Sequence, residues 1–356
     1  MSELLQERVV KIKVIGIGGA GNNVINRMIE AGVSGVDFVC VNTDKQDLNK
    51  SPCENKVQIG EKLTGGMGAG SKPDIGKKSA EESRAAIAKI LEGTDMVFIT
   101  AGMGGGTGTG AAPIVADLAH EAGILTVAVV TKPFKFEGAN RMRQAEAGIA
   151  ELEDKVDSLL IIPNDRLKYV TDQKITFANA FGIADDVLKQ AVMSISELVG
   201  YSEKVIINQD FADVSAIMKD AGRAHMGVGI AAGKDKAVEA ANLAVSSPLL
   251  ETSIDGATGV LVNVCGPEDM TLEDVDTAAE IVQEAVHADA NIIFGATYSD
   301  DFQDEIRVTV IATGFDKKPK VVAAPVAEPV AAEASEEAAE PVDVSDIDEI
   351  FKLFNR

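Results

Sequence analysis

The chain has 356 residues, of which 46% are hydrophobic and 25% charged, and this is more than one hydrophobic core usually holds. We therefore expect a folded protein of two domains. Lysine and arginine number 33 against 56 aspartate and glutamate residues, and the net charge of −23 disfavours nucleic acid and anionic lipid as partners. Any nucleotide phosphate must then be bound by local backbone N–H groups.

The amino-terminal segment from Met1 to Lys13 carries several charged residues and no hydrophobic signal-peptide core. No run approaches the roughly 18 apolar residues of a membrane span. The three cysteines (Cys40, Cys53 and Cys265) lack metal-binding spacing. We expect a cytoplasmic protein with reduced cysteines and no direct membrane insertion.

Strand and helix patterns alternate from Lys11 to Thr131. Apolar runs typical of strands lie at 11–16, 36–42, 96–100 and 124–131, and a helix-like segment spans 22–31. Near-continuous valine and isoleucine runs between helices indicate a parallel sheet covered on both faces. Such sheets bind ligands beyond the carboxyl ends of their strands.

A long helix is predicted from Phe177 to Val199, and Gly200 ends it. It would span roughly 30 Å at 1.5 Å per residue. A second α/β pattern follows, with strands at 205–209, 259–266, 291–298 and 306–314 and helices at 211–221 and 234–246. We expect a second α/β domain there.

The carboxyl-terminal part changes composition. Residues 317–342 hold 4 of the 11 prolines and are rich in Ala, Val and Glu, which indicates a linker. The last residues then regain helical spacing of apolar side chains, at Ile347, Ile350, Phe351 and Phe354. A short helix that docks in a partner's groove and a frayed tail both fit this pattern.

The first glycine loop runs from Gly16 to Gly21 and matches the pattern G-x-G-x-x-G between a strand and a helix. Its glycines would let the backbone approach a pyrophosphate at the start of the helix. The same pattern equally suits a dinucleotide-dependent oxidoreductase in which Asp37 contacts a ribose. This loop alone does not decide between the two.

The second glycine loop, Gly104 to Gly110 (GGGTGTG), follows the strand at 96–100 and precedes a helix with Pro113 near its first turn. Five glycines in seven residues would be entropically costly in a plain turn. Backbone N–H groups and the hydroxyls of Thr107 and Thr109 could instead surround a polyphosphate. No G-x-x-x-x-G-K-[ST] sequence occurs, so this is not a Walker-type loop.

The GGGTGTG heptad, together with NQDFAD at Asn208 to Asp213, resembles the FtsZ family of bacterial tubulin-like GTPases. The resemblance covers roughly residues 9–315 and implies a polymerising GTPase of the cell-division ring. It implies an α/β fold with a parallel-sheet GTP-binding domain (1–175), a core helix (176–200), an activation domain (201–316), a disordered linker (317–342) and a terminal peptide (343–356). An oxidoreductase has no use for the second loop, and a filament protein without hydrolysis is the other alternative.

The resemblance also implies which residues surround GTP. Residues expected at the phosphates are Gly19, Ala20, Gly21, Asn22, Asn23, Asn42, Asp44, Gly70, Gly104, Gly105, Gly106, Thr107, Gly108 and Thr109. Glu137 and Arg141 would hold the ribose and its surroundings, although their i, i+4 spacing equally fits a surface ion pair. Mg²⁺ would be held mainly by the phosphates and water.

Base recognition would fall to Asn164, to Phe181 by stacking, and to Asp185. A carboxylate accepts from the guanine N1–H and 2-amino groups, a donor pair that adenine lacks, and this would select GTP over ATP. The family often has one Asp and one Asn here, whereas this chain has Asp185 and Asp186, so either could face the base. Acids early in a helix are also common as partners of the helix dipole.

The implied catalytic residues are Asn208, Asp210 and Asp213. Asp210 and Asp213 also have the spacing of a helix N-cap with an acid three residues later. In the family this loop enters the nucleotide pocket of the next subunit, where the two carboxylates would polarise water that Asn208 positions. The implied assembly is a head-to-tail homopolymer.

The resemblance further implies that the terminal peptide binds division proteins, including membrane tethers, at midcell. The peptide here lacks the proline of its family counterpart, which leaves the identity of the partner open. The three histidines (His120, His225 and His287) lie on separate helical patterns, and no metal site is predicted from them.

Overall fold

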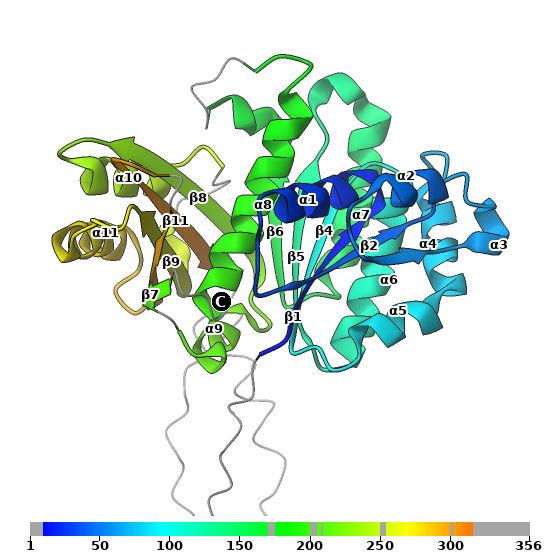
Figure 1. Ribbon diagram of the computed structural model, residues 1–356, viewed down its shortest axis with the longest axis horizontal. Coiled ribbons are helices and arrows are strands. Elements are labelled where there is room, and N and C mark those ends of the chain that lie inside the picture. The colour runs from blue at the N-terminus through cyan, green and yellow to red at the C-terminus, as the bar shows by residue number, and fades with distance from the viewer. Residues whose placement is uncertain are drawn as a thin grey trace, which may run out of the picture. The chain divides into compact units, whose positions relative to one another are not determined.

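The computed structural model describes residues 10–169, 175–199, 205–207, 209–249, 254–299 and 302–315. Strands within these residues form one eleven-stranded sheet of order β3-β2-β1-β4-β5-β6-β8-β11-β9-β10-β7 (Figure 1). The strands are β1 (Ile12–Ile17), β2 (Asp37–Asn42), β3 (Asn55–Gln58), β4 (Met96–Gly102), β5 (Leu125–Lys132), β6 (Ser158–Pro163), β7 (Val205–Ile207), β8 (Gly222–Ala232), β9 (Gly259–Gly266), β10 (Asn291–Tyr298) and β11 (Glu305–Thr313).

Eleven α-helices lie within the described residues, together with three short 3-10 turns. The helices are α1 (Gly18–Glu30), α2 (Lys45–Lys50), α3 (Glu61–Thr64), α4 (Pro73–Glu82), α5 (Arg84–Leu91), α6 (Thr107–Glu121), α7 (Ala139–Glu153), α8 (Ala180–Val199), α9 (Phe211–Met218), α10 (Lys236–Val245) and α11 (Leu272–Ala285). The 3-10 turns are η1 (Lys135–Glu137), η2 (Asn164–Tyr169) and η3 (Ile254–Gly256).

The first six strands are all parallel, in the order β3-β2-β1-β4-β5-β6. The chain moves outward from β1 to β2 on one side and then returns to place β4 on the other side. The order therefore reverses between β1 and β4, where Ile17 and Ala101 are direct partners near the strand ends. Ligands of such sheets bind at this reversal, beyond the carboxyl ends of the strands.

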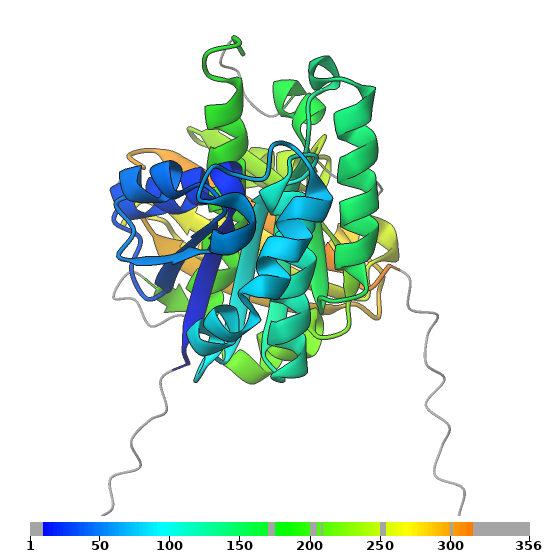
Figure 2. The same cartoon turned by 90° about the vertical axis from the view of Figure 1, so that its right-hand side faces the viewer.

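Helices cover both faces of this parallel sheet. Successive residues of β1 point to opposite faces, so Val14 packs with α1 and α8 while Ile15 packs with α5, α6 and α7. Figure 2 shows the cyan and teal helices of the second group together on one face. Burial on both sides explains the near-continuous apolar runs, and the predicted α/β class with a parallel sheet is confirmed.

Helix α8 is the predicted long helix, although it begins at Ala180 rather than Phe177. Figure 1 shows it running between the two halves of the sheet. In the second half, β11 is antiparallel to both β8 and β9, so this half is mixed. Helices α10 and α11 cover one of its faces, and α8 and α9 contribute to the core on the other.

Strand β8, which joins the two halves by pairing with β6, was not predicted from the sequence. Its sequence is glycine-rich, which argues against a strand on propensity alone. Gly227 and Gly229 face α10, and a Cβ atom there would lie 1.9 Å from the Ala244 oxygen and 2.0 Å from the Ala240 oxygen. These glycines therefore permit a helix to pack closely on the strand.

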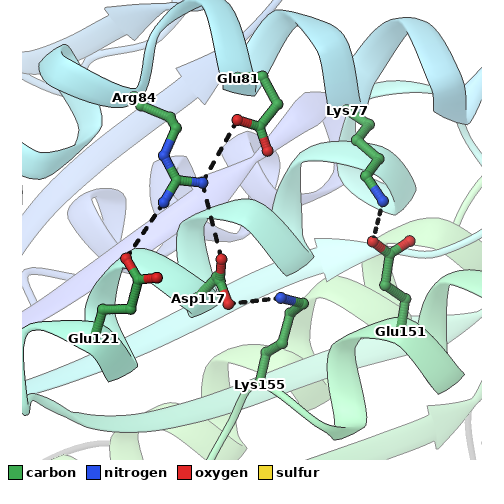
Figure 3. Close-up of polar contacts among 7 residues, drawn as sticks. All are labelled: Lys77, Glu81, Arg84, Asp117, Glu121, Glu151 and Lys155. Atoms are coloured by element: carbon green, nitrogen blue, oxygen red, sulfur yellow. Dashed lines mark hydrogen bonds and ion pairs between the residues drawn. The ribbon is translucent and has the colours of Figure 1, made fainter.

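Ion pairs connect the helices on the α4–α7 face (Figure 3). Arg84 contacts Glu81, Asp117 and Glu121, Lys155 pairs with Asp117 at 2.6 Å, and Lys77 pairs with Glu151. The seven side chains are between 26% and 62% exposed, so each pair contributes little stability. The network therefore links neighbouring helices at the surface without adding much to the stability of the fold.

Several predictions fall outside the described residues: Asn208, the linker at 317–342 and the peptide at 343–356. Within the described part of the chain, none of the helices combines the length and hydrophobicity of a membrane span. Cys40, Cys53 and Cys265 are buried and form no disulfide.

Candidate nucleotide-binding site

Two helices begin at the reversal of strand order. Helix α1 follows β1 directly, and α6 begins at Thr107, shortly after β4 ends at Gly102. Neither helix has a side chain capping its first N–H groups. Unpaired N–H groups and the positive end of the helix dipole attract anions, so two such ends meet at one place.

A cavity of about 240 Å³ opens where these two helices begin. Eleven of the predicted binding residues line it: Gly19, Ala20, Gly105, Gly106, Thr107, Gly108, Glu137, Arg141, Asn164, Phe181 and Asp185. They come from segments that lie far apart in the sequence, from the start of α1 to the first turns of α8. The fold therefore gathers the two glycine loops and the residues expected at the ribose and the base around one pocket.

The glycines of the heptad serve two different purposes. A Cβ on Gly110 would lie 2.0 Å from the Pro73 oxygen, because α4 packs closely on α6 there. Gly105 lies on the pocket wall, has no positive φ, and would have nothing within 4 Å of its Cβ. Packing therefore accounts for Gly110, whereas the space beside Gly105 is available to a ligand.

Eight predicted binding residues do not line the pocket: Gly21, Asn22, Asn23, Asn42, Asp44, Gly70, Gly104 and Thr109. Several of them shape the loops instead. Asp44 caps α2 by accepting from the N–H groups of Gln46 and Asp47, and Thr109 Oγ1 accepts from the Gly104 N–H at 2.8 Å. When its amide is oriented to satisfy its neighbours, buried Asn22 donates to the carbonyl oxygens of Gly16 and Val41.

The expectation that both threonine hydroxyls contact the phosphates stays a prediction, and the two hydroxyls have different surroundings: that of Thr109 accepts from the Gly104 N–H within the loop. Thr107 lines the pocket, where its hydroxyl lies 2.7 Å from that of Thr43. Pro113 also differs from its prediction, because α6 begins at Thr107 and the proline lies inside the helix.

Glu137 and Arg141 form the ion pair that their spacing allows, and both lie at the pocket where the ribose is expected. Arg141 Nη1 lies 3.1 Å from Glu137 Oε2, and Glu137 Oε1 accepts from the Phe134 N–H at 2.8 Å. Both residues also line the pocket, with the Glu137 side chain only 8% exposed. The pair is thus a charged part of the cavity wall in which Glu137 is buried and the Arg141 side chain is 50% exposed.

The far end of the pocket is suited to a polar ring. Asn164, at the start of η2, is 5% exposed, and its Oδ1 atom has no hydrogen-bond partner. A buried unpaired polar atom is costly unless a ligand or water satisfies it. Phe181 is 43% exposed and makes an edge-on contact with Phe134, with ring centroids 5.6 Å apart.

The two aspartates on α8 have different surroundings. Asp185 lines the pocket with a side chain 11% exposed, whereas Asp186 is 49% exposed, does not line the pocket, and lies 3.6 Å from Lys189. Burial raises the pKa of Asp185 to about 6, against the lowering effect of Arg27, whose Nε lies 3.3 Å from Asp185 Oδ2. Asp185 is therefore the better placed of the two carboxylates to contact a ligand in this cavity.

Seven further lining residues were not named individually as binding residues, although two of them lie in the predicted first glycine loop: Ile17, Gly18, Gly102, Met103, Thr131, Pro133 and Ala184. Gly18 belongs to the G-x-G-x-x-G pattern, and Thr131 and Pro133 lie at and just beyond the end of β5. Thr131 could therefore have been predicted from the sequence, because it ends the strand predicted at 124–131 and ligands bind beyond such strand ends. Arg27, which contacts both aspartates of α8, had no signal because its partners lie far from it in the sequence.

The predicted catalytic acids lie outside the pocket. Asp210 precedes α9 and Asp213 lies in its first turn, and both are exposed. Asp210 makes no side-chain capping bond. The adjacent Gln209 donates its N–H to the Leu198 oxygen at 3.0 Å, which places this loop at the carboxyl end of α8.

One histidine has neighbours that the sequence did not indicate. Potential ligand atoms of His120, Asp157 and Asp220 lie within 4.8 Å of one another. Asp157 is buried, but its oxygens already accept from the Thr126 and Asp220 N–H groups at 2.8 and 3.3 Å. The arrangement is accounted for as a junction of β5, β6 and the turn before β8.

A parallel sheet with two uncapped helix ends at its reversal point, and a pocket ending in a buried amide and carboxylate, defines a nucleotide-binding α/β protein. Comparison with known families gives two matches. Residues 11–172 match the GTPase domain of the Tubulin/FtsZ family, and residues 222–316 match the C-terminal domain of the FtsZ family.

Solved structures agree with these matches. An FtsZ dimer from M. jannaschii is 44% identical and superposes with a TM-score of 0.84 over 88% of this chain and 90% of that one. A mutant FtsZ from the same organism is 44% identical, with a TM-score of 0.83 over 87% and 92% of the two chains. The chain therefore belongs to the FtsZ family, and it is a GTPase that binds GTP and GDP.

A more distant solved structure shares only the fold with this chain. CetZ1 from Haloferax volcanii is 21% identical and has a TM-score of 0.70 over 86% of this chain and 94% of that one.

Proposed function

We propose that this GTPase assembles head to tail into filaments of the cell-division ring, and that each bound GTP is hydrolysed with the help of the next subunit. Asp210 and Asp213 of that subunit would polarise the attacking water, and Asn208, which lies outside the described residues, would position it. GTP would then hold two subunits together until its hydrolysis weakens the contact.

The positions of the pocket and the acidic loop carry this proposal. Asp185 lies near the start of α8, and Leu198, which accepts from the Gln209 N–H, lies near its end. The stretch of helix between them is about 20 Å long at 1.5 Å per residue. The acidic loop therefore lies at the other end of α8 from Asp185. This separation supports a role for these acids in the pocket of a stacked copy rather than in their own.

The surroundings of the acids are consistent with this role. Asp210 makes no capping bond, and within the described residues neither carboxylate has an ion-pair partner at 4.0 Å or less. A catalytic carboxylate must be free to contact water, whereas a structural cap is engaged. Capping therefore does not account for the Asp210 carboxylate, whereas Asp213 also has a favourable position beside the positive end of the α9 dipole.

The pocket also fits magnesium bound through the nucleotide. Its lining carboxylates are Glu137 and Asp185, and each is already paired with an arginine. Mg²⁺ would therefore be held chiefly by phosphate oxygens and water, close to the Thr107 hydroxyl, and would neutralise phosphate charge.

Membership of the family supports a proposal about the biological setting. The relative from M. jannaschii is described as a dimer, which supports self-association here. We infer a cytoplasmic protein that acts at midcell, with the domain limits given above and with a peptide at 343–356 that binds division proteins, including membrane tethers. Co-sedimentation of synthetic 343–356 peptide with candidate partners would test the last point.

The proposal is tested by sedimentation and phosphate release over a range of protein concentrations, with GTP and then with GDP. Assembly should require GTP, and activity per subunit should rise steeply above the concentration at which polymer pellets. Constant activity per subunit from dilute monomer to polymer would contradict hydrolysis at subunit contacts. Polymer that forms without any phosphate release would instead support a filament protein without hydrolysis.

A further inference from the structure

Arg27 occupies an unusual position relative to the pocket. It lies in the last turn of α1, the same helix whose first residues form the phosphate end of the cavity. Its Nε atom lies 3.3 Å from Asp185 Oδ2, and its Nη1 atom lies 3.4 Å from Asp186 Oδ1. One planar guanidinium thus contacts two consecutive carboxylates through different nitrogen atoms.

The neighbouring backbone leaves room for this contact. A Cβ atom on Gly182 would lie 2.8 Å from Arg27 Nη2. The first turn of α8 therefore carries a glycine where any larger side chain would displace the guanidinium. The two ion pairs hold Arg27 against the carboxylate that lines the pocket, and Gly182 leaves room for its guanidinium.

We propose that Arg27 is a positioning residue for base recognition: it keeps Asp185 ionised and fixes the direction in which its carboxylate faces the guanine. The inference rests on the proposed role of Asp185 as the reader of the base. Arg27 itself does not line the pocket and needs no contact with the nucleotide.

The charges around Asp185 show why a partner is needed. Asp186 opposes its ionisation, and burial opposes it more strongly. Across the cavity, Glu137 and Arg141 pair with each other, and η2 contributes the neutral Asn164. Lys189 lies beside Asp186 rather than Asp185. Arg27 is thus the cation in direct contact with Asp185 among the described residues.

Guanine donates two hydrogen bonds, from N1–H and the 2-amino group, so it requires the ionised carboxylate with both oxygens available. A carboxylate oxygen has two lone pairs and can accept from Arg27 and from guanine together. Burial raises the pKa of Asp185 to about 6 with Arg27 present. Removing a contacting cation typically raises a carboxyl pKa by about one unit or more, which would leave much of Asp185 protonated near pH 7.

The test measures GDP and inosine diphosphate affinity by calorimetry from pH 5.5 to 8.5, which avoids hydrolysis. Inosine diphosphate lacks the 2-amino group, so the ratio of the two affinities reports recognition by Asp185. The variants are Arg27→Gln, Arg27→Lys and Gly182→Ala, and the matched control is Arg143→Gln. Arg143 is an exposed arginine of α7 whose described contact is with Asn140 at 3.4 Å.

For Arg27→Gln we expect the pH midpoint of GDP binding to rise by about one unit, with an affinity about two- to tenfold lower at pH 7 and recovered at pH 8.5. Gly182→Ala should shift the midpoint in the same direction but by less, because the guanidinium can move away from the added methyl group. Arg27→Lys should keep the pH midpoint of GDP binding, because the positive charge remains. It should reduce the preference for GDP over inosine diphosphate, because one ammonium group cannot contact both carboxylates as a guanidinium does. Arg143→Gln should change neither.

An equal loss of affinity at every pH in Arg27→Gln would assign a merely structural role to the arginine and overturn the inference. A midpoint shift of the same size in Arg143→Gln would also overturn it, because any nearby positive charge would then suffice. Failure of the unaltered protein to bind GDP would contradict the proposed site itself, and this outcome is distinct from the other two.

Discussion

The substitution Gly105→Ala separates ligand space from packing space in the second glycine loop. An added methyl group would meet no atom of the protein within 4 Å, and the backbone has no positive φ. The nucleotide-free fold should therefore be unchanged or more stable by up to about 1 kcal/mol, since alanine restricts the unfolded chain. The methyl group would instead project into the space that we assign to phosphate.

Loss of one charge-assisted hydrogen bond between backbone N–H and phosphate costs about 1.5–3 kcal/mol, so GDP affinity should fall by about 10- to 150-fold. Calorimetric titration gives the affinity, and thermal unfolding without nucleotide gives the stability. Gly110→Ala is the contrasting variant, because its methyl group would overlap the Pro73 oxygen at 2.0 Å and should destabilise the fold by about 1–3 kcal/mol or more. Wild-type affinity in Gly105→Ala would refute the assignment of this space to phosphate.

Three further predictions follow from the same geometry. In the folded protein the pKa of Asp185 is raised from 3.8 to about 6, so the protonated carboxyl favours folding and this stabilisation is lost as pH rises through that range. Asp185→Asn should therefore raise the free energy of unfolding at pH 7.5, measured by urea titration, by at most about 3 kcal/mol, and should weaken guanine selectivity. Equal stability at pH 7.5 and no loss of selectivity would contradict this. Asp213→Ala should bind GDP within about twofold of wild type but release phosphate about 100-fold more slowly, and parallel losses of both would argue against a role in turnover alone. Asp117→Ala, which breaks the pairs with Lys155 and Arg84, should lower the free energy of unfolding by about 1 kcal/mol or less, by still less in high salt, and should leave phosphate release unchanged.

The parts of the fold that sequence predicted best are those with strong periodic patterns. The apolar runs of β1, β4 and β5 are buried on both faces, so their continuity in sequence reflects their environment directly. Helix α8 was predicted because its sequence keeps a helical pattern over 20 residues. Strand β8 was missed because its glycines are needed for close packing against α10, and the sequence of the strand alone gives no sign of that contact.

The sequence predicted the site well where the residues of a motif line the pocket. It predicted the site less well where the residues of a motif support a loop without lining the pocket. Gly105 and Thr107 line the cavity, but Asn22 and Asp44, from equally recognisable motifs, hold strand and helix ends together. Sequence spacing cannot distinguish these two roles. Arg27 shows the other limit, since its proposed function depends on a contact between α1 and α8, which are distant in the sequence.

Mixing two defective variants tests most directly whether hydrolysis requires a second copy. Gly105→Ala should bind nucleotide poorly but retain its acidic loop, whereas a double variant, Asp210→Ala with Asp213→Ala, should bind GTP but lack that loop's carboxylates. Each alone should release little phosphate, and an equimolar mixture should recover activity, because the acids of the first can meet GTP held by the second. A mixture no more active than the sum of its parts, under conditions in which both variants sediment together, would contradict catalysis between subunits.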